Sequence, residues 1–267
     1  DLGIDVDDPL TYLLTRQRID PATPNRQAPE PAVDRLFDVP AERSFLLTGH
    51  ARLSATADDK VLANVWTTSL AGPQDARRAT ATASVRLPGS VTSRGDAAVD
   101  GDPATAWQTP FDGSIGASLT VAQPMPVEVS ELTITWRNDN KHAAPLLLSV
   151  TDGPTSFQVN VQPTTSGSAL VTETIPVPSF IATETTITLD GVSARTVPEY
   201  YSGVERLLPV GLAEIAFGPA TAVTPPTRPR ELDTGCRSDL ITLDDQPLAV
   251  QVSGDLDGVL DIKACEG

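Results

Sequence analysis

The chain has 267 residues, enough for one or two domains with a real core, and its 19 Lys and Arg against 35 Asp and Glu give a formal charge of −16. This charge repels phosphate backbones, so it excludes nucleic acid as a partner and disfavours docking on anionic lipid. Two His and two Cys are too few for multi-ligand zinc sites or iron–sulfur clusters. No apolar run reaches the roughly 20 residues of a membrane span, so we expect a soluble piece of a larger protein.

Helical periodicity is scarce along the chain. The best candidates are Leu10–Arg18 and Asp59–Leu70, the second preceded by Asp58 at the N-cap position. Three segments have the composition of linkers: Asp20–Pro31, Ala71–Ala83 and Pro219–Arg230.

Period-two alternation dominates instead and predicts a mainly β protein. The clearest strands are Ser44–Ser54, Leu132–Trp136, Thr185–Leu189, Leu248–Val252 and Val259–Ile262. The last two linkers bracket about 140 residues, a normal size for a β-sandwich. We therefore predict a sandwich over 80–224 and a second, smaller β-domain over 36–79 and 225–267. We prefer a smaller domain that is discontinuous, with the sandwich inserted between its early and late strands. The alternative is that the chain forms two separate β-domains in series. Residues 1–35 are a linker or the end of a preceding domain.

The two cysteines, Cys236 and Cys265, lie near the end of the chain beside turn glycines. They are either a disulfide or two unrelated buried thiols, and we favour the disulfide because cysteine is otherwise absent. A bridge would place this part of the chain in an oxidising compartment such as the cell envelope.

The most specific local motif is A98-V-D-G-D-P-A-T-A-W107. Its D-G-D-P core is a tight turn in which Asp side chains bond nearby backbone. The carboxylates of Asp100 and Asp102, the Thr105 hydroxyl and backbone carbonyls also suit a hard cation such as Ca²⁺. The motif alone leaves both interpretations open.

In its wider setting, residues 84–217 resemble the discoidin-like (coagulation-factor C-type) domains, which include the family 32 carbohydrate-binding modules. The resemblance combines this motif with the strand pair G116-A-S-L-T-V and V129-S-E-L-T-I-T-W136 and the closing strand G211-L-A-E-I-A-F217. It implies a jelly-roll sandwich with Trp107 and Trp136 in its core. It also implies a structural Ca²⁺ held by Asp100, Asp102, Thr105, Glu214 and a carbonyl of Ala97 or Ala98.

A broader resemblance covers residues 36–267. The runs P40-A-E-R-S-F45, Y200-Y-S-G203, L208-P-V-G-L-A-E214 and C236-R-S-D-L-I-T-L-D244 are similar to the extracytoplasmic region of the actinobacterial α-(1→3)-arabinofuranosyltransferase D family. Those polytopic membrane enzymes, mycobacterial ones included, build cell-wall arabinan from a polyprenyl-phosphate donor. The resemblance implies a non-catalytic region outside the cytoplasm, tied to the membrane through the membrane-embedded part of the same polypeptide.

Such a region would bind arabinan-type glycan through aromatic and polar side chains on loops at one end of the sandwich. Two sets of residues have that character: the aromatics Phe111, Tyr200 and Tyr201, and the polar loop residues Asn138, Asp139, Asn140 and His142. The alternative is that the loop is an ordinary hairpin connection and that the rings only pack on the sandwich end. With 4 % aromatic residues in all, any sugar site is expected to be polar, shallow and weak.

Catalysis has little support, because the chain contains no nucleophile elbow, zinc-protease, P-loop or dinucleotide motif. We expect this region not to be an enzyme, although its parent would be a glycosyltransferase. Two other functions remain: a purely structural or partner-binding β-domain, and a glycoside hydrolase that uses two of the many carboxylates.

Overall fold

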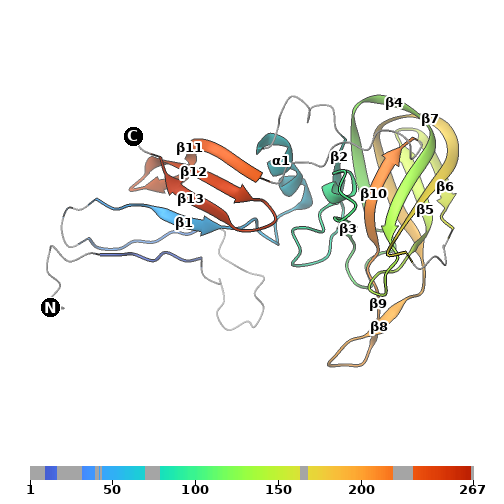
Figure 1. Ribbon diagram of the computed structural model, residues 1–267, viewed down its shortest axis with the longest axis horizontal. Helices are drawn as coiled ribbons and strands as arrows, with labels where there is room; N and C mark the ends of the chain where they lie inside the picture. The colour runs from blue at the N-terminus through green and yellow to red at the C-terminus, as the bar shows by residue number, and fades with distance from the viewer. Residues whose placement is uncertain are drawn as a thin grey trace.

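The structure is a computed structural model that describes residues 10–16, 32–39, 42, 44–69, 79–162, 168–218 and 231–265. The molecule is elongated, with a β-sandwich at one end, a small sheet at the other and helix α1 (Asp59–Ser69) between them (Figure 1). Helix α1 agrees with the prediction, whereas the predicted linkers Asp20–Pro31 and Pro219–Arg230 lie outside the described residues. Within the described ranges, no helix is long and apolar enough to cross a membrane.

The sandwich is one antiparallel sheet that curls over on itself. Its strand order is β3-β10-β4-β7-β5-β6, and β2 pairs with β4 beside this path. Its strands are β2 (Thr80–Ala83), β3 (Trp107–Gln108), β4 (Ser118–Arg137), β5 (Pro145–Asp152), β6 (Thr155–Asn160), β7 (Leu170–Val192) and β10 (Gly211–Phe217).

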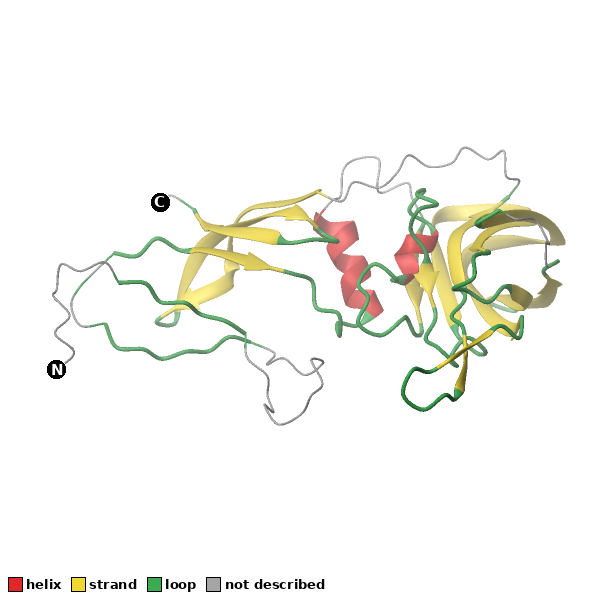
Figure 2. Ribbon diagram, turned by 60° about the horizontal axis from the view of Figure 1, so that its bottom comes forward, coloured by secondary structure: helices red, strands yellow, loops and turns green. Residues whose placement is uncertain are grey.

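Curling is possible because β4 and β7 are unusually long, with 20 and 23 residues. They pair with each other along almost their whole length, and the register shifts twice between Ala122 and Glu131. Such irregularities let a strand bend sharply. Figure 1 shows β4 and β7 curving at the end of the sandwich, and Figure 2 shows the curved strands of the sandwich from another side. One edge of β4 pairs with β2 near its start and with β10 near its end.

The core of the sandwich follows the predicted alternation. Leu132, Ile134 and Trp136 are buried within β4, and Trp107 on β3 is buried as well, so both tryptophans are core residues as expected. The intervening Thr133 and Thr135 pair their hydroxyls with threonines of β7 on the other side of the sheet. Period-two burial on a curled sheet therefore confirms a mainly β, discoidin-like sandwich.

The smaller sheet has the order β1-β13-β12-β11, all antiparallel. It joins β1 (Thr48–Ala51) from early in the chain to β11 (Glu231–Leu243), β12 (Gln246–Asp255) and β13 (Leu260–Ala264) from its end. A disulfide links Cys236 to Cys265 with the Cα atoms 6.1 Å apart, as predicted. Two short strands, β8 (Thr196–Pro198) and β9 (Glu205–Leu207), form a hairpin that projects from the sandwich.

Three expectations were wrong in detail. Residues 10–16 are not helical. The ring centroid of Tyr12 lies 4.2 Å from that of Phe37 and 5.7 Å from that of Phe45. These contacts between residues far apart in the sequence outweigh the weak helix propensity of a short segment. Of the strand predicted over Ser44–Ser54, only Thr48–Ala51 (β1) is a strand in the structure. The last four residues of the predicted linker Ala71–Ala83 form β2, which completes the edge of β4.

Candidate functional site

The D-G-D-P turn follows the short 3₁₀ helix η2 (Gly95–Ala98) and leads into β3. Gly101 has a φ of 79°, which a side chain would strain, so glycine is required at this corner. Asp100 Oδ1 accepts the N–H of Asp102 at 2.9 Å, and Asp102 Oδ1 accepts the N–H of Ala104 at 2.9 Å. The carboxylates thus hold the turn, as the simpler interpretation of the motif requires.

The same turn also gathers more oxygen atoms than its hydrogens can satisfy. The Thr105 hydroxyl lies within 3.2 Å of four acceptors: both carboxylate oxygens of Asp100 and the carbonyls of Ala97 and Asp102. A hydroxyl can donate only one hydrogen at a time. The cluster is therefore rich in oxygen and poor in donors, which is the chemistry that a hard cation needs.

Glu214 on β10 completes this cluster from the neighbouring strand. Its Oε1 atom is buried without a hydrogen-bond partner. Burial, together with the charges of Asp100 and Asp102, raises the pKa of Glu214 to about 8. Burial likewise raises the pKa of Asp100. Asp100 and Glu214 are thus two partly buried carboxyl groups of one cluster, and burial disfavours the charged form of each.

The donor set fits a hard cation only if backbone oxygens take part. Among the described residues, no three His, Cys, Asp or Glu side chains are grouped so as to hold a metal ion. Asp100 and Glu214 would supply carboxylates, Thr105 its hydroxyl, and Ala97 and Asp102 their carbonyls. Calcium accepts such mixed oxygen sets. Of the two alanines considered, Ala97 has its carbonyl 3.2 Å from the Thr105 hydroxyl, and both Ala97 and Ala98 are buried.

The predicted polar loop connects β4 to β5 and is firmly held. Asp139 Oδ1 accepts the N–H of Lys141 at 2.8 Å and lies 2.7 Å from His142 Nδ1. Partial burial opposes ionisation of Asp139, but these bonds lower its pKa. His142 is itself buried, with Nε2 3.2 Å from Gln108 Oε1, so Asp139 and His142 form the frame of the loop. Asn140 at its tip is exposed.

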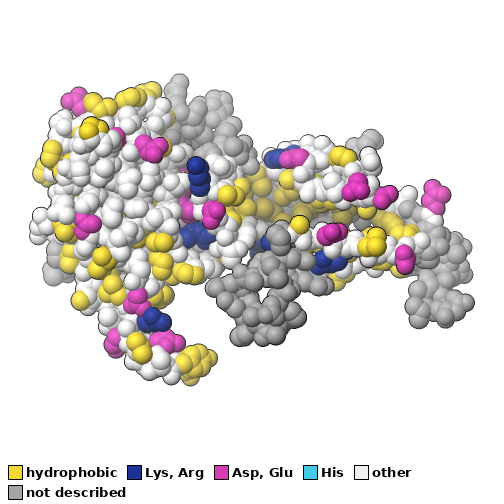
Figure 3. All heavy atoms as spheres, turned by 180° about the vertical axis from the view of Figure 1, so that it is seen from behind, with side chains coloured by type: hydrophobic (Ala, Val, Ile, Leu, Met, Phe, Trp, Pro, Cys, Tyr) yellow, Lys and Arg dark blue, Asp and Glu magenta, His cyan; other side chains and the backbone are white. Residues whose placement is uncertain are grey.

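The predicted aromatic residues lie on the hairpin and the loop beside it. Tyr200 and Tyr201 at the hairpin tip are each 91 % exposed, and their rings meet edge to face at 5.1 Å. Figure 3 shows hydrophobic side chains at this tip with charged ones just behind them. Phe111 is 47 % exposed in the loop after β3. None of these rings is used to fill the core.

The base of the hairpin ties the three candidate elements together. Arg195, just before β8, donates from Nη1 to the carbonyls of Asp139 (2.5 Å) and His142 (3.0 Å) in the polar loop. Asp112, next to Phe111, accepts the N–H of Leu207 and pairs with Arg206 on β9, both at 2.7 Å. These bonds lower the pKa of Asp112. The sequence-predicted sugar residues thus belong to one end of the sandwich.

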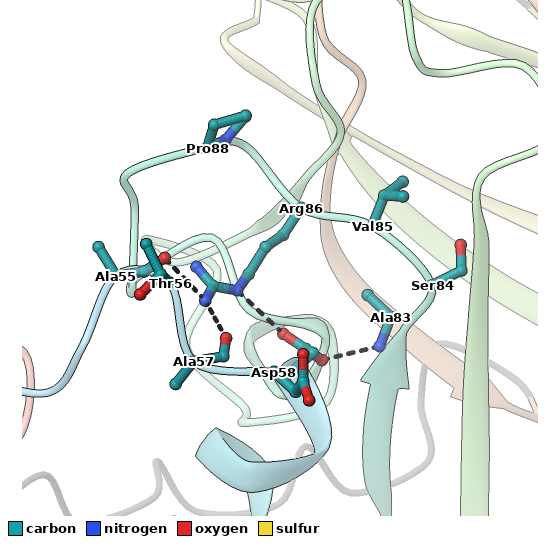
Figure 4. A pocket seen from close by; sticks show the side chains of 10 residues that line it. Ala55, Thr56, Ala57, Asp58, Ala83, Ser84, Val85, Arg86 and Pro88 are labelled. Carbon is teal, nitrogen blue, oxygen red and sulfur yellow. Dashed lines mark hydrogen bonds and ion pairs between the residues drawn. The ribbon is translucent and has the colours of Figure 1, made fainter. Parts of the chain in front are cut away.

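A pocket of about 220 Å³ lies elsewhere, between the start of α1 and β2 (Figure 4). It is lined by Ala55–Asp59, Ala83–Arg86 and Pro88. Arg86 bridges it by donating to the carbonyls of Ala55 (3.0 Å), Ala57 (2.5 Å) and Ser90 (2.7 Å), and lies 3.6 Å from Asp59. None of the predicted site residues lines this pocket. The Arg86 guanidinium is already paired with protein groups, so we assign the pocket a structural role.

Sequence reasoning missed Arg94, which is buried next to the acidic turn, with Nη2 3.8 Å from Asp100 Oδ2. A single arginine in a polar stretch carries no pattern that marks it as buried. Its second partner, Asp257, is 163 residues away and equally unmarked.

Taken together, a curled antiparallel sandwich with an acidic turn beside its closing strand and polar loops at one end defines the class of discoidin-like carbohydrate-binding modules. The family described as arabinofuranosyltransferase D, third carbohydrate binding module, matches residues 74–229, and the chain belongs to this family. No curated protein sequence gives a significant match.

Among solved structures, the fold is similar to that of arabinofuranosyltransferase AftD from Mycobacteria. In that structure the match has 19 % identity and a TM-score of 0.56, covering 75 % of this chain and 16 % of that one. In a mutant of the same protein it has 18 % identity and a TM-score of 0.58, covering 83 % and 17 %. The chain therefore spans about a sixth of the length of these structures.

A family 32 carbohydrate-binding module from C. perfringens NanJ, solved with galactose, also matches. It has 20 % identity and a TM-score of 0.37, and the match covers 54 % of this chain and 93 % of that one.

Proposed function

We propose that the sandwich is a non-catalytic glycan-binding module of a membrane-attached arabinofuranosyltransferase, and that it takes arabinan-type chains outside the cytoplasm. The family to which the chain belongs supports a carbohydrate-binding role. The observation that carries the proposal is that hydrogen bonds hold the polar loop, the Phe111 loop and the tyrosine hairpin together at one end of the sandwich. The disulfide supports an oxidising compartment.

The site would bind sugar by hydrogen bonds to vicinal hydroxyls and by stacking on exposed rings. Asn140 offers both a donor and an acceptor, and it sits on a loop whose frame is already fixed by Asp139, His142 and Arg195. A fixed loop loses little conformational freedom on binding. Because few rings are exposed, the affinity should be modest and should rise with the number of sugar units that one chain presents.

The cluster of Asp100 and Glu214 is proposed to hold a structural Ca²⁺. The ion would neutralise two partly buried carboxylates and satisfy the unpartnered Oε1 of Glu214. It would stabilise the fold and would not contact the sugar-binding residues. At a concentration about 100 times its dissociation constant, a single ion adds roughly 2.7 kcal/mol to the free energy of unfolding.

The sugar site is tested by calorimetric titration of the full chain with linear and branched arabinan oligosaccharides. Asn140→Ala and Tyr201→Ala should each weaken binding about three- to tenfold, as expected for contacts worth about 0.5–1.5 kcal/mol. The matched controls are Asn64→Ala on helix α1 and Met125→Ala in the middle of β4, two exposed positions outside the polar loop, the Phe111 loop and the hairpin, which should leave binding unchanged. Asp139→Ala is unsuitable, because it removes the frame of the loop. Absence of binding across the panel would contradict the proposal.

A structural or partner-binding role is the second candidate, and one observation favours it. The short N-terminal segments 10–16, 32–39 and 44–47 expose several large apolar side chains. They are Leu13, Leu14, Val33, Leu36, Val39, Phe45 and Leu46. This role predicts no glycan affinity but loss of activity in the parent protein when the region is deleted.

A further inference from the structure

Arg94 lies at the boundary between the sandwich and the small sheet. Its side chain is 1 % exposed, and its Nη1 atom is 3.1 Å from Asp257 Oδ1 in the turn between β12 and β13. Its Nη2 atom is 3.8 Å from Asp100 Oδ2 in the acidic turn of the sandwich. One buried guanidinium therefore lies between a carboxylate of each region.

The segment around Arg94 contacts both the small sheet and the elements at the edge of the sandwich. Val91 packs against the leucine cluster of the small sheet. The Gly95 N–H donates to the carboxylate of Asp59 at the start of α1, and a Cβ at Gly95 would lie 2.6 Å from the Ala83 nitrogen. Figure 1 shows α1 between the small sheet and the edge of the sandwich at this point.

We propose that Arg94 and Asp257 are positioning residues that couple cation binding at Asp100 and Glu214 to the seating of the small sheet on the sandwich. The inference rests on the proposed cation site. The physical argument is competition for one carboxylate. A divalent cation on Asp100 repels the guanidinium and cancels the charge that attracts it, which leaves Asp257 as the stronger of these two partners.

The coupling must be reciprocal. If the cation strengthens the contact between Arg94 and Asp257, then that contact must strengthen cation binding by the same factor. Without the Asp257 carboxylate, Arg94 would pair more strongly with Asp100, and an incoming cation would have to displace it.

The test is calcium titration of the full chain by calorimetry. Asp257→Asn should raise the dissociation constant for Ca²⁺ at least about fivefold, the lower end of ordinary coupling between sites. Asp261→Asn is the matched control. It removes the same charge from β13, where Asp261 is exposed and faces His50, and it should leave the affinity unchanged. Asp257→Glu, which restores the charge, should recover most of the wild-type affinity.

The reciprocal measurement is hydrogen exchange of the turn at residues 255–259, with and without Ca²⁺. Calcium should slow exchange there in the wild-type chain and should not do so in Asp257→Asn. A residue that only stabilised the small sheet would alter exchange equally in both conditions and would not move the calcium affinity.

The outcomes separate the two proposals. If the wild-type chain binds no Ca²⁺, both the cation site and the coupling are overturned. If wild type and Asp257→Asn bind Ca²⁺ with equal affinity, the cation site stands and the coupling alone is wrong. If Asp257→Asn does not fold, the wild-type chain and Asp257→Glu carry the test. Hydrogen exchange at residues 255–259 that Ca²⁺ leaves unchanged in both chains overturns the coupling.

Discussion

The sandwich and the small sheet are both antiparallel, but they differ in what lies at their centres. The sandwich buries Trp107, Trp136 and a continuous set of aliphatic side chains. The buried cluster of the small sheet consists of Leu232, Leu256 and Leu260, with partly buried neighbours from β1, α1 and Val91. The first region stabilises itself by burial, whereas the second depends on a disulfide and on contact with its neighbour.

The largest expected difference is in the cost of deleting a core side chain. Trp136→Ala should lower the free energy of unfolding by about 3–5 kcal/mol, because the closed sandwich cannot collapse around the cavity. Leu256→Ala in the small sheet should cost about 2 kcal/mol, the lower end for leucine, because its thin layer can relax. Urea unfolding followed by circular dichroism measures both. Equal losses would show that the small sheet has a core as closed as that of the sandwich.

This difference explains why the sandwich could be predicted better than its surroundings. Alternation within Leu132–Trp136 and Thr185–Leu189 is a direct consequence of burial on one face, so the strands were found where burial is strong. Residues 10–16 have no such face, and the contact of Tyr12 with Phe37 and Phe45 arises only in three dimensions. The two long strands were predicted only as fragments, because the register shifts in β4 have no sequence signal of their own.

The second expected effect concerns the disulfide. Replacing Cys236 and Cys265 together by Ser should cost roughly 3.5 kcal/mol in the chain-entropy model. The loss should be confined to the small sheet, so amides of β11–β13 should exchange faster while those of β4 and β7 keep wild-type rates. Reduction of the wild-type chain serves as the control and should give the same pattern. Equally faster exchange in β4 and β7 would mean that the two regions unfold as one unit.

The candidate site was predictable in its residue types but not in its connections. The D-G-D-P motif is local in sequence, and the resemblance to discoidin-like domains added Glu214 on the closing strand to the acidic cluster. The contacts that hold the site join residues far apart in the chain. They are the hydrogen bonds of Arg195 and Asp112 at the base of the hairpin and the ion pair of Arg94 with Asp257. No local pattern predicts such contacts, so the frame of the site came only from the structure.

The smallest expected effect lies in the acidic cluster at the border of the two regions. The pKa of Glu214 is raised from 4.5 to about 8, so the folded state binds this proton more tightly than the unfolded chain does. In the presence of a chelator, stability should therefore fall as the pH rises from about 4.5 to about 8, by on the order of 2 kcal/mol after allowance for solvent screening.

Glu214→Gln should flatten this slope, because the neutral amide has no proton to lose, while Glu128→Gln on an exposed position of β4 should leave it intact. Saturating Ca²⁺ should abolish the slope in the wild-type chain, since the ion favours the charged carboxylate. Thermal melts at several pH values measure all of these effects. A slope that survives in Glu214→Gln would show that other carboxylates cause it.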